Sequence, residues 1–248
     1  MSLNGSQIRT HEIPIEVGCK YRTAVLLTGP LLYRFGKVKI PKYESKNNRK
    51  ISIKRFMDTW ESLGFRVTQD EKYIEVYNDG SVGGCNINFR IKSHTATDNA
   101  ILSSVFVKGE TFITNASEEI EIDDLINLLN IMGASIEKVE EGKLKIVGAS
   151  IFKNASFEVC SDKSEVATFA SLAVLTKGNI SIKNVNRDGI LQFINFLNKI
   201  GIRFEFSENE LRVWRHDEEL NPINLEISPT PGFVSDWQAM SVLILTQA

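Results

Sequence analysis

Residues 100–116 read AILSSVFVKGETFITNA, and residues 169–185 read FASLAVLTKGNISIKNV. In both stretches an almost wholly apolar run leads to Lys-Gly and then to a short segment in which apolar and polar residues alternate. An asparagine follows at the same place in each, Asn115 and Asn184. The apolar run is typical of a helix that is buried on all sides, and the alternation is typical of a strand. The repeat therefore predicts a chain assembled from copies of one structural unit.

Each copy continues with a second helix and a pair of strands. Apolar side chains recur at three- and four-residue spacing in residues 125–132 and 190–197, which predicts an amphipathic helix in each. Gly133 and Gly201 follow these helices and are expected to end them in the left-handed conformation. The glycines after the first helices, Gly109 and Gly178 among them, are expected to do the same. The order in one unit is then helix, strand, helix, strand, strand.

A weaker copy precedes these two, in AVLLTGPLLYRFGKVKI at residues 24–40, and a fourth copy begins with SDWQAMSVLILTQA at residues 235–248. The pattern predicts an N-terminal segment, three repeat units and the start of a truncated fourth unit. Their expected boundaries are 1–21, 22–92, 93–160, 161–227 and 228–248.

One unit cannot bury both of its helices and its strands, whereas three units can if their apolar helices turn inward around a common axis. The expected fold class is therefore α/β (α+β): an inside-out α/β barrel of repeated helix-strand-helix-strand-strand units. A doubly wound sheet fits less well, because its strands return through helices rather than through hairpins. Separate small α+β domains are the other alternative.

The composition excludes several classes of protein. Of 248 residues, 42% are hydrophobic and 24% are charged, and the net charge is −2, which is typical of a globular protein. Without a long basic run, no nucleic acid partner is expected, and without an apolar run of roughly 20 residues, no membrane span is expected. Three cysteines match no metal-ligand spacing and predict reduced thiols in a cytoplasmic protein.

Three stretches carry a resemblance to a known family: RTAVLLTGPLL with RFG at residues 22–36, NASEEIEIDD at 115–124 and SPTPGFVSDWQA at 228–239. They are similar to motifs of the enolpyruvyl transferases, in particular of the branch that acts on UDP-N-acetylglucosamine. The last stretch is the most specific. The resemblance covers almost the whole chain, corresponds to the middle of a family member, and implies the enolpyruvyl transferase fold, a pair of inside-out barrels of three units each.

The resemblance implies transfer of the enolpyruvyl group of phosphoenolpyruvate to the 3-hydroxyl of UDP-N-acetylglucosamine, with release of phosphate. This is the first committed step of peptidoglycan synthesis, and it needs no cofactor and no metal. Two alternatives stay open. One is the shikimate-pathway relative, 3-phosphoshikimate 1-carboxyvinyltransferase, and the other is a non-catalytic fragment or diverged paralogue that binds a nucleotide sugar.

The reaction needs a base for the sugar hydroxyl and an acid for the methylene carbon. Asp236 matches the family's aspartate, and Ser235 is expected to cap the helix that contains it; a plain helix-start aspartate is the alternative. Glu44, in the expected catalytic loop 41–50, stands where the family has its cysteine acid. A carboxylic acid can donate a proton if burial raises its pKa. An exposed loop carboxylate in an inactive protein is the favoured alternative for Glu44.

The expected substrate contacts are basic and polar. Arg22 and Arg49 match family arginines, and guanidinium suits phosphate and carboxylate oxygens; surface positions are the alternative for both. Lys92 and Ser93 stand where the family contacts a diphosphate, and Ser93 precedes a helix whose N–H groups can face a phosphate. His94 completes the candidate set, although a histidine there is more often a capping or surface residue. The apolar run at 242–245 could also lead the chain to self-associate.

Overall fold

The computed structural model describes residues 2–42, 53–217 and 219–248. The chain divides into two compact units, and each is described by itself. Unit 1 comprises Met1–Ser117 and Leu125–Ser156, and unit 2 comprises Glu118–Asp124 and Phe157–Ala248. Glu44 and Arg49 lie outside the described residues. None of the helices in the described ranges combines the length and the hydrophobicity needed to cross a membrane.

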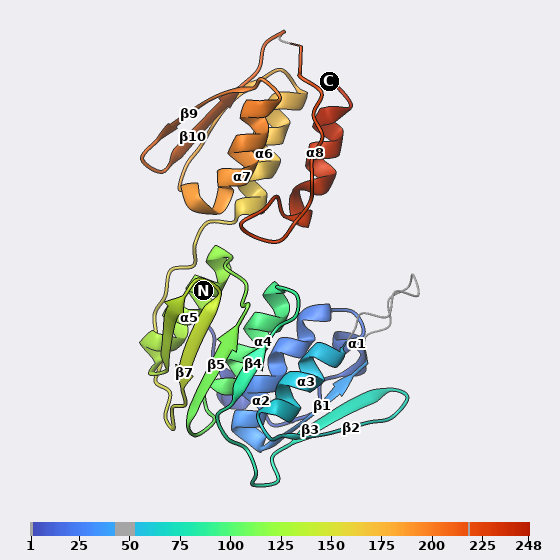
Figure 1. Ribbon diagram of the computed structural model, residues 1–248, viewed down its shortest axis with the longest axis vertical. Coiled ribbons are helices and arrows are strands. Elements are labelled where there is room, and N and C mark those ends of the chain that lie inside the picture. Colours follow the sequence, from blue (N-terminus) through green and yellow to red (C-terminus); the bar gives the residue numbers. More distant parts are fainter. Residues whose placement is uncertain (1, 43–52, 218) are drawn as a thin grey trace. The chain divides into compact units, whose positions relative to one another are not determined.

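The first part of unit 1 carries a three-stranded antiparallel sheet in the order β1-β3-β2 (Figure 1). Its elements are η1 (Gly5–Gln7), α1 (Ile15–Gly18), η2 (Arg22–Leu27), α2 (Thr28–Phe35), β1 (Lys37–Pro41), α3 (Lys54–Ser62), β2 (Arg66–Gln69) and β3 (Tyr73–Tyr77). The segment around Glu12 lies parallel to β1 beside Lys39. The expected first helix thus begins as the 3₁₀ turn η2, because Gly29 and Pro30 follow so closely, and continues as α2.

The second part of unit 1 carries a four-stranded sheet in the order β4-β5-β7-β6, in which β4 and β5 are parallel. Its elements are β4 (Asn86–Asn88), α4 (His94–Ser104), β5 (Glu110–Thr114), α5 (Ile120–Met132), β6 (Ser135–Glu140) and β7 (Lys143–Val147). The first turns of α5 belong to unit 2 and its remainder belongs to unit 1. The order helix, strand, helix, strand, strand from α4 to β7 agrees with the sequence prediction.

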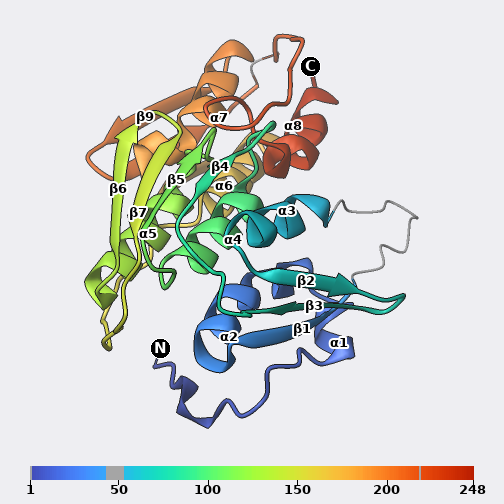
Figure 2. The same cartoon turned by 60° about the horizontal axis from the view of Figure 1, so that its bottom comes forward.

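Helix α4 is the centre of unit 1, and no residue of it is exposed. It packs against η2, α2 and α3 (Figure 2). The approach of α2 depends on Gly29, because a Cβ there would lie 2.2 Å from the carbonyl oxygen of Leu102. Trp60 from α3 is completely buried, and its indole Nε1 donates to Ser103 Oγ at 3.3 Å. These neighbours leave no residue of α4 exposed, although the helix carries polar side chains such as Asp98 and Asn99.

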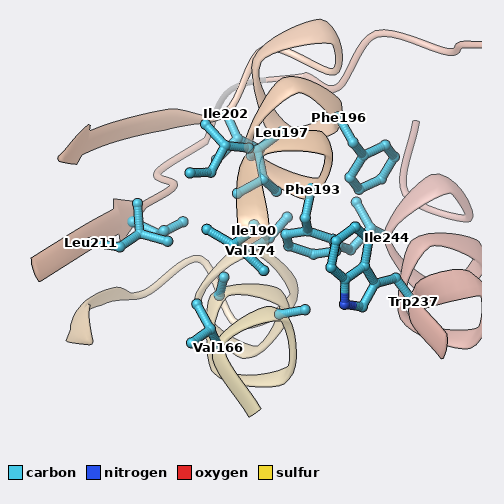
Figure 3. Packing of buried hydrophobic residues seen from close by; sticks show 14 of the residues in the cluster. Val166, Val174, Ile190, Phe193, Phe196, Leu197, Ile202, Leu211, Trp237 and Ile244 are labelled. Atoms are coloured by element: carbon cyan, nitrogen blue, oxygen red, sulfur yellow. The ribbon is translucent and has the colours of Figure 1, made fainter. Parts of the chain in front are cut away.

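Unit 2 repeats the same order and adds one helix. Its elements are α6 (Lys163–Leu175), β8 (Asn179–Ile182), α7 (Arg187–Lys199), β9 (Arg203–Ser207), β10 (Glu210–Trp214), η3 (Ser235–Trp237) and α8 (Gln238–Leu245). The sheet is antiparallel in the order β8-β10-β9. Figure 3 shows Phe193 and Phe196 of α7 meeting Trp237 and Ile244. The boundaries predicted for the repeat units stay a prediction, because the two compact units do not test them.

The helix ends agree with the sequence at several glycines and differ at two, since α4 already ends at Ser104, five residues before Gly109. Gly36, Gly133 and Gly201 take the left-handed conformation after α2, α5 and α7. After α6, however, Lys177 takes it, with φ of 51°, so the expectation for Gly178 is wrong. The amide N–H of Gly178 instead donates to the carbonyl of Ala173 at 2.8 Å, which is the 6→1 bond of a Schellman ending. The chain therefore turns one residue earlier than the glycine indicates.

Candidate active site

The N-terminus of α4 is the best-defined part of the candidate site. Ser93 is the N-cap, and its Oγ accepts from the amide N–H of Ala96 at 3.5 Å. Lys92 precedes it and is half-buried. His94 Nε2 lies 3.3 Å from Asp98 Oδ2, one turn further along the helix. The structure therefore places Lys92, Ser93 and His94 together at a helix end whose partial positive charge suits an anion.

Two strand ends hold the segment that leads into this helix. Asn115, at the end of β5, donates from Nδ2 to the carbonyl of Phe89 at 2.7 Å. It does so in the left-handed conformation, with φ of 57°, which asparagine tolerates better than most residues. The amide N–H of Phe89 donates in turn to the carbonyl of Thr114 at 3.1 Å. The asparagine of the repeat is therefore a structural residue that fixes the chain just before Arg90.

A cavity of about 470 Å³ opens beside this segment in unit 1. It is lined by the first turns of α3 and by residues 87–91, and its cations are Lys54, Arg55 and Arg90. Asp58 is its one acidic lining residue. Sequence reasoning did not select these three cations as ligands. The available signal was the basic cluster KNNRKISIKR, residues 46–55, whose last two residues form the start of α3.

Arg22 begins η2 and is exposed. The segment that it begins is fixed against α4, because Asn99 Nδ2 donates to the carbonyl of Val25 at 3.0 Å. Asn99 is completely buried, so this bond is shielded from water. The backbone of η2 is thus held by the helix that Ser93 caps, while the guanidinium of Arg22 is free to reach a ligand.

Asp236 lies in unit 2, in the 3₁₀ turn η3 that leads into α8, and it is exposed. Two aromatic residues near Asp236 in the sequence, Trp237 and Phe233, are buried. Trp237 is 2% exposed, and its ring contacts the ring of Phe233 edge-on, with 5.3 Å between the ring centroids. The predicted cap is wrong, because Val234 is the N-cap and no side chain caps the turn. Burial of Trp237 and Phe233, rather than a side-chain cap from Ser235, holds the turn that carries Asp236.

Part of the acidic stretch at 115–124 stabilises the fold. Lys163, at the start of α6, is buried and forms ion pairs with Glu119 and with Glu121, the latter at 3.0 Å. Burial lowers the pKa of Lys163, but the hydrogen bonds from its ammonium to the two carboxylates outweigh burial, and the pKa is raised overall. Two of the carboxylates in this stretch therefore neutralise a buried cation within unit 2.

Cys160 stands close to this ion cluster. Burial, and next its hydrogen bond with Asp124, raise the pKa of the Cys160 thiol to about 11. The Asp124 carboxylate also accepts from the amide N–H of Cys160 at 2.6 Å. Because its pKa is raised, the Cys160 thiol is protonated and slow to react at neutral pH.

The described residues hold no group of three or more His, Cys, Asp and Glu side chains placed to bind a metal.

Comparisons with known proteins identify the family and the fold of the chain. The model of the family described as EPSP synthase (3-phosphoshikimate 1-carboxyvinyltransferase) matches residues 3–248. The chain belongs to the EPSP synthase family. Among solved structures, the enolpyruvyl transferase NikO from Streptomyces tendae matches with a TM-score of 0.82 at 17% identity, covering 96% of this chain and 57% of that one. The predicted enolpyruvyl transferase fold is thereby confirmed.

Curated members of the family are closer in sequence. The UDP-N-acetylglucosamine 1-carboxyvinyltransferase 1 of Clostridium acetobutylicum is 34% identical over 249 residues, covering 100% of this chain and 59% of the relative. The UDP-N-acetylglucosamine 1-carboxyvinyltransferase of Rickettsia bellii is 31% identical over 246 residues, covering 98% of this chain and 58% of the relative. The chain thus spans somewhat less than three fifths of the length of these enolpyruvyl transferases.

Proposed function

We propose that the chain contributes to transfer of the enolpyruvyl group from phosphoenolpyruvate to the 3-hydroxyl of UDP-N-acetylglucosamine. The names of the relatives at 31–34% identity support this substrate pair over others in the family. The observation in the structure that carries the proposal is the capped N-terminus of α4, which follows directly on a cavity with three cations. Such a surface suits a diphosphate.

Each residue of the site has a proposed role. The hydroxyl of Ser93, the N–H groups of the first turn of α4 and the ammonium of Lys92 bind the diphosphate of the nucleotide sugar. His94 adds a positive charge there when it is protonated. Arg22 binds carboxylate or phosphate oxygens of the substrates, and Arg49, which the structure does not describe, has the same proposed role.

The proton transfers fall to two carboxyl groups. Asp236 accepts the proton of the sugar hydroxyl, and its exposure leaves the carboxylate accessible to a substrate. Glu44 donates a proton to the methylene carbon, a role that stays a prediction for a residue outside the described part of the chain. If the acid is a carboxyl and not a thiol, then fosfomycin should leave the protein unalkylated. A covalent adduct at Glu44 in a peptide mass spectrum would count against this assignment.

Binding of UDP-N-acetylglucosamine tests the nucleotide site separately from catalysis. Isothermal titration should show binding to the chain and a loss of about 10- to 100-fold in affinity for Arg90→Ala, since one charge-assisted bond contributes about 1.5–3 kcal/mol. Arg66→Ala is the matched control, because Arg66 is an exposed arginine of β2 in the same unit. If both variants bind UDP-N-acetylglucosamine as tightly as the parent chain, the cavity is not part of the nucleotide site.

Phosphate release from phosphoenolpyruvate tests the reaction itself. Release that depends on UDP-N-acetylglucosamine supports the proposal, and release that depends on shikimate 3-phosphate supports the shikimate-pathway alternative. The non-catalytic alternative is favoured by one observation, the glutamate in place of the family's cysteine. Binding of the nucleotide sugar without any phosphate release would leave the non-catalytic alternative standing.

The proposed reaction also implies a cytoplasmic protein, since both substrates are cytoplasmic metabolites. It needs no cofactor. Self-association through residues 242–245 stays a prediction. Light scattering of the chain at several concentrations tests it.

A further inference from the structure

His94 and Asp98 form a pair on the first two turns of α4. Nε2 of the imidazole lies 3.3 Å from Oδ2 of the carboxylate. The side chain of Asp98 is 14% exposed, whereas that of His94 keeps 37% of its surface exposed. The carboxylate is therefore largely withdrawn from water, while the imidazole is accessible to a ligand at the helix end that Ser93 caps.

The contact with Asp98 determines which ring nitrogen of His94 carries a hydrogen. A carboxylate accepts hydrogen bonds, so the nitrogen that lies against it must be an N–H group. That nitrogen is Nε2. In a neutral imidazole one nitrogen is N–H and the other is an acceptor, so Nδ1 of the neutral ring presents a lone pair. A phosphate oxygen is also an acceptor, and this lone pair would repel it.

Protonation reverses this property of Nδ1. An imidazolium is a donor at both nitrogens, so Nε2–H can stay with Asp98 while Nδ1–H is donated to an anion. His94 is the first residue of α4, and Nδ1 is bonded directly to Cγ, so it lies closer to the backbone of the first turn than Nε2 does. The protonated ring therefore offers a donor beside the N–H groups of the helix end, and the neutral ring offers an acceptor there.

The charged groups around His94 come from the segment before α4 and from the elements that pack on this helix, η2, α2, α3 and β7. Lys143 and Lys145 of β7 already pair with glutamates, and α3 carries the acids Asp58 and Glu61. Cations nevertheless prevail, and they are Arg22, Arg34, Lys54, Arg55, Arg90 and Lys92. An imidazolium at His94 adds to a surface that already suits the negative charges of a diphosphate.

We propose that binding of the diphosphate of UDP-N-acetylglucosamine at the start of α4 is coupled to the uptake of one proton by His94, with Asp98 as the positioning residue that holds the ring. This inference rests on the proposed function and deepens it. Asp98 keeps the Nε2–H group, the diphosphate accepts from Nδ1–H, and the proton comes from the solvent. Because the bound state holds more protons than the free state, affinity for the nucleotide sugar falls as the pH rises through the range in which histidine titrates.

The effect of Asp98 on binding has a sign that separates positioning from simple repulsion. A carboxylate near a bound diphosphate repels it, so Asp98→Asn would strengthen binding if repulsion were the only effect. If Asp98 acts through His94, the same change weakens binding. The reason is that an amide can offer either its oxygen or its N–H₂ group to Nε2, and the ring is then no longer held with Nε2 as the donor.

Calorimetry of UDP-N-acetylglucosamine binding in buffers of different ionisation enthalpy measures the proton uptake directly. The diphosphate of this ligand is a diester that stays ionised near neutral pH, so the protein must take up the proton. At pH 7.5 the chain should take up as much as about one proton per ligand. His94→Gln should abolish the uptake and lower the affinity about 10- to 100-fold, since one charge-assisted hydrogen bond is lost. Asp98→Asn should reduce both quantities, and Asp98→Glu, which keeps a carboxylate at this position, should retain the uptake.

His11→Gln and Glu61→Gln are the matched controls and should leave uptake and affinity unchanged. His11 lies beside the ring of Phe35, and Glu61 is exposed on α3 outside the lining of the cavity. Circular dichroism establishes that each variant is folded. Binding without proton uptake, or uptake that persists in His94→Gln, would overturn the inference and leave the proposed function intact. Tighter binding by Asp98→Asn with unchanged uptake would overturn the positioning role. A folded chain that does not bind UDP-N-acetylglucosamine at all would overturn the nucleotide site of the proposed function and this inference with it.

Discussion

The ammonium of Lys163 lies 3.0 Å from a carboxylate oxygen of Glu121, and Glu119 pairs with the same ammonium. The side chain of Lys163 is 7% exposed and that of Glu119 is 12% exposed. A charge in such a place is stable only while its partners remain, since an unpaired buried ion is strongly unfavourable. The start of α5 is thus joined to the start of α6 by electrostatics.

Replacing the cation tests how much this cluster contributes. Lys163→Met removes the cation that both partly buried carboxylates contact, and the free energy of unfolding should fall by about 3–5 kcal/mol. Urea denaturation followed by tryptophan fluorescence measures it, with Trp214 and Trp237 as probes within unit 2. Lys177→Met is the control: Lys177 pairs with Asp217 on the surface, where water screens the ion pair and its loss should change the free energy of unfolding little. Equal losses in the two variants would contradict this account.

The same cluster predicts an alkaline limit to stability. The pKa of Lys163 in the folded chain is raised above its ordinary value of 10.5. A folded state that binds its proton more tightly is stabilised fully below pH 10.5, and this contribution is lost as pH rises through the raised pKa. The difference in unfolding free energy between the parent chain and Lys163→Met should therefore be constant from pH 7 to 10 and shrink above that. A difference that already shrinks near neutral pH would exclude the raised pKa.

Cys160 provides a test by chemical labelling. Because burial and Asp124 hold the pKa of the thiol at about 11, iodoacetamide should modify it slowly at pH 8 and progressively faster toward pH 11. Asp124→Asn removes the negative charge and should shift this profile to lower pH. Peptide mass spectrometry gives the rate at Cys160 alone. A midpoint near 9, the ordinary value for a thiol, would show that the environment has no effect.

Asn115 combines a left-handed backbone with a side-chain bond, and two substitutions separate the contributions. Asn115→Gly removes the bond to Phe89 and should cost about 0.5–1.5 kcal/mol of unfolding free energy. Asn115→Ala removes the bond and also forces a Cβ residue into the left-handed region, at a further cost of about 1 kcal/mol. Thermal or urea unfolding measures both. If alanine proved no worse than glycine, the conformation would not be the reason for asparagine at this position.

The repeat and the order of its elements could be predicted because both depend on local periodicity. The apolar runs became α4 and α6, and the alternating segments that follow became β5 and β8. The left-handed turn at Lys177 could not be predicted, since Gly178 one residue later looks like the better candidate for it. The choice follows from the bond between Gly178 and Ala173, which no pattern of residue types displays.

The helix start at Ser93 could be predicted because its motif is contiguous, while the roles of its residues stay predictions. Lys92, Ser93 and His94 were selected together and do lie together at the start of α4. Arg90 belongs to no motif, and it joins the cavity only because the segment after β4 lies beside α3. The cap expected from Ser235 failed for a related reason. Burial of Phe233 and Trp237 determines that turn, and burial is a property of the tertiary structure.

The division of α5 between the two units has a consequence for synthesis on the ribosome. Glu119 and Glu121 leave the ribosome more than forty residues before Lys163, their partner. Until then the nascent chain carries the start of a helix whose neutralising cation has not been made, while the remainder of α5 already has its sheet partners in unit 1 up to Val147. The N-terminal unit can therefore mature first, with the first turns of α5 unsupported, and the helix is completed only when translation has passed the start of α6.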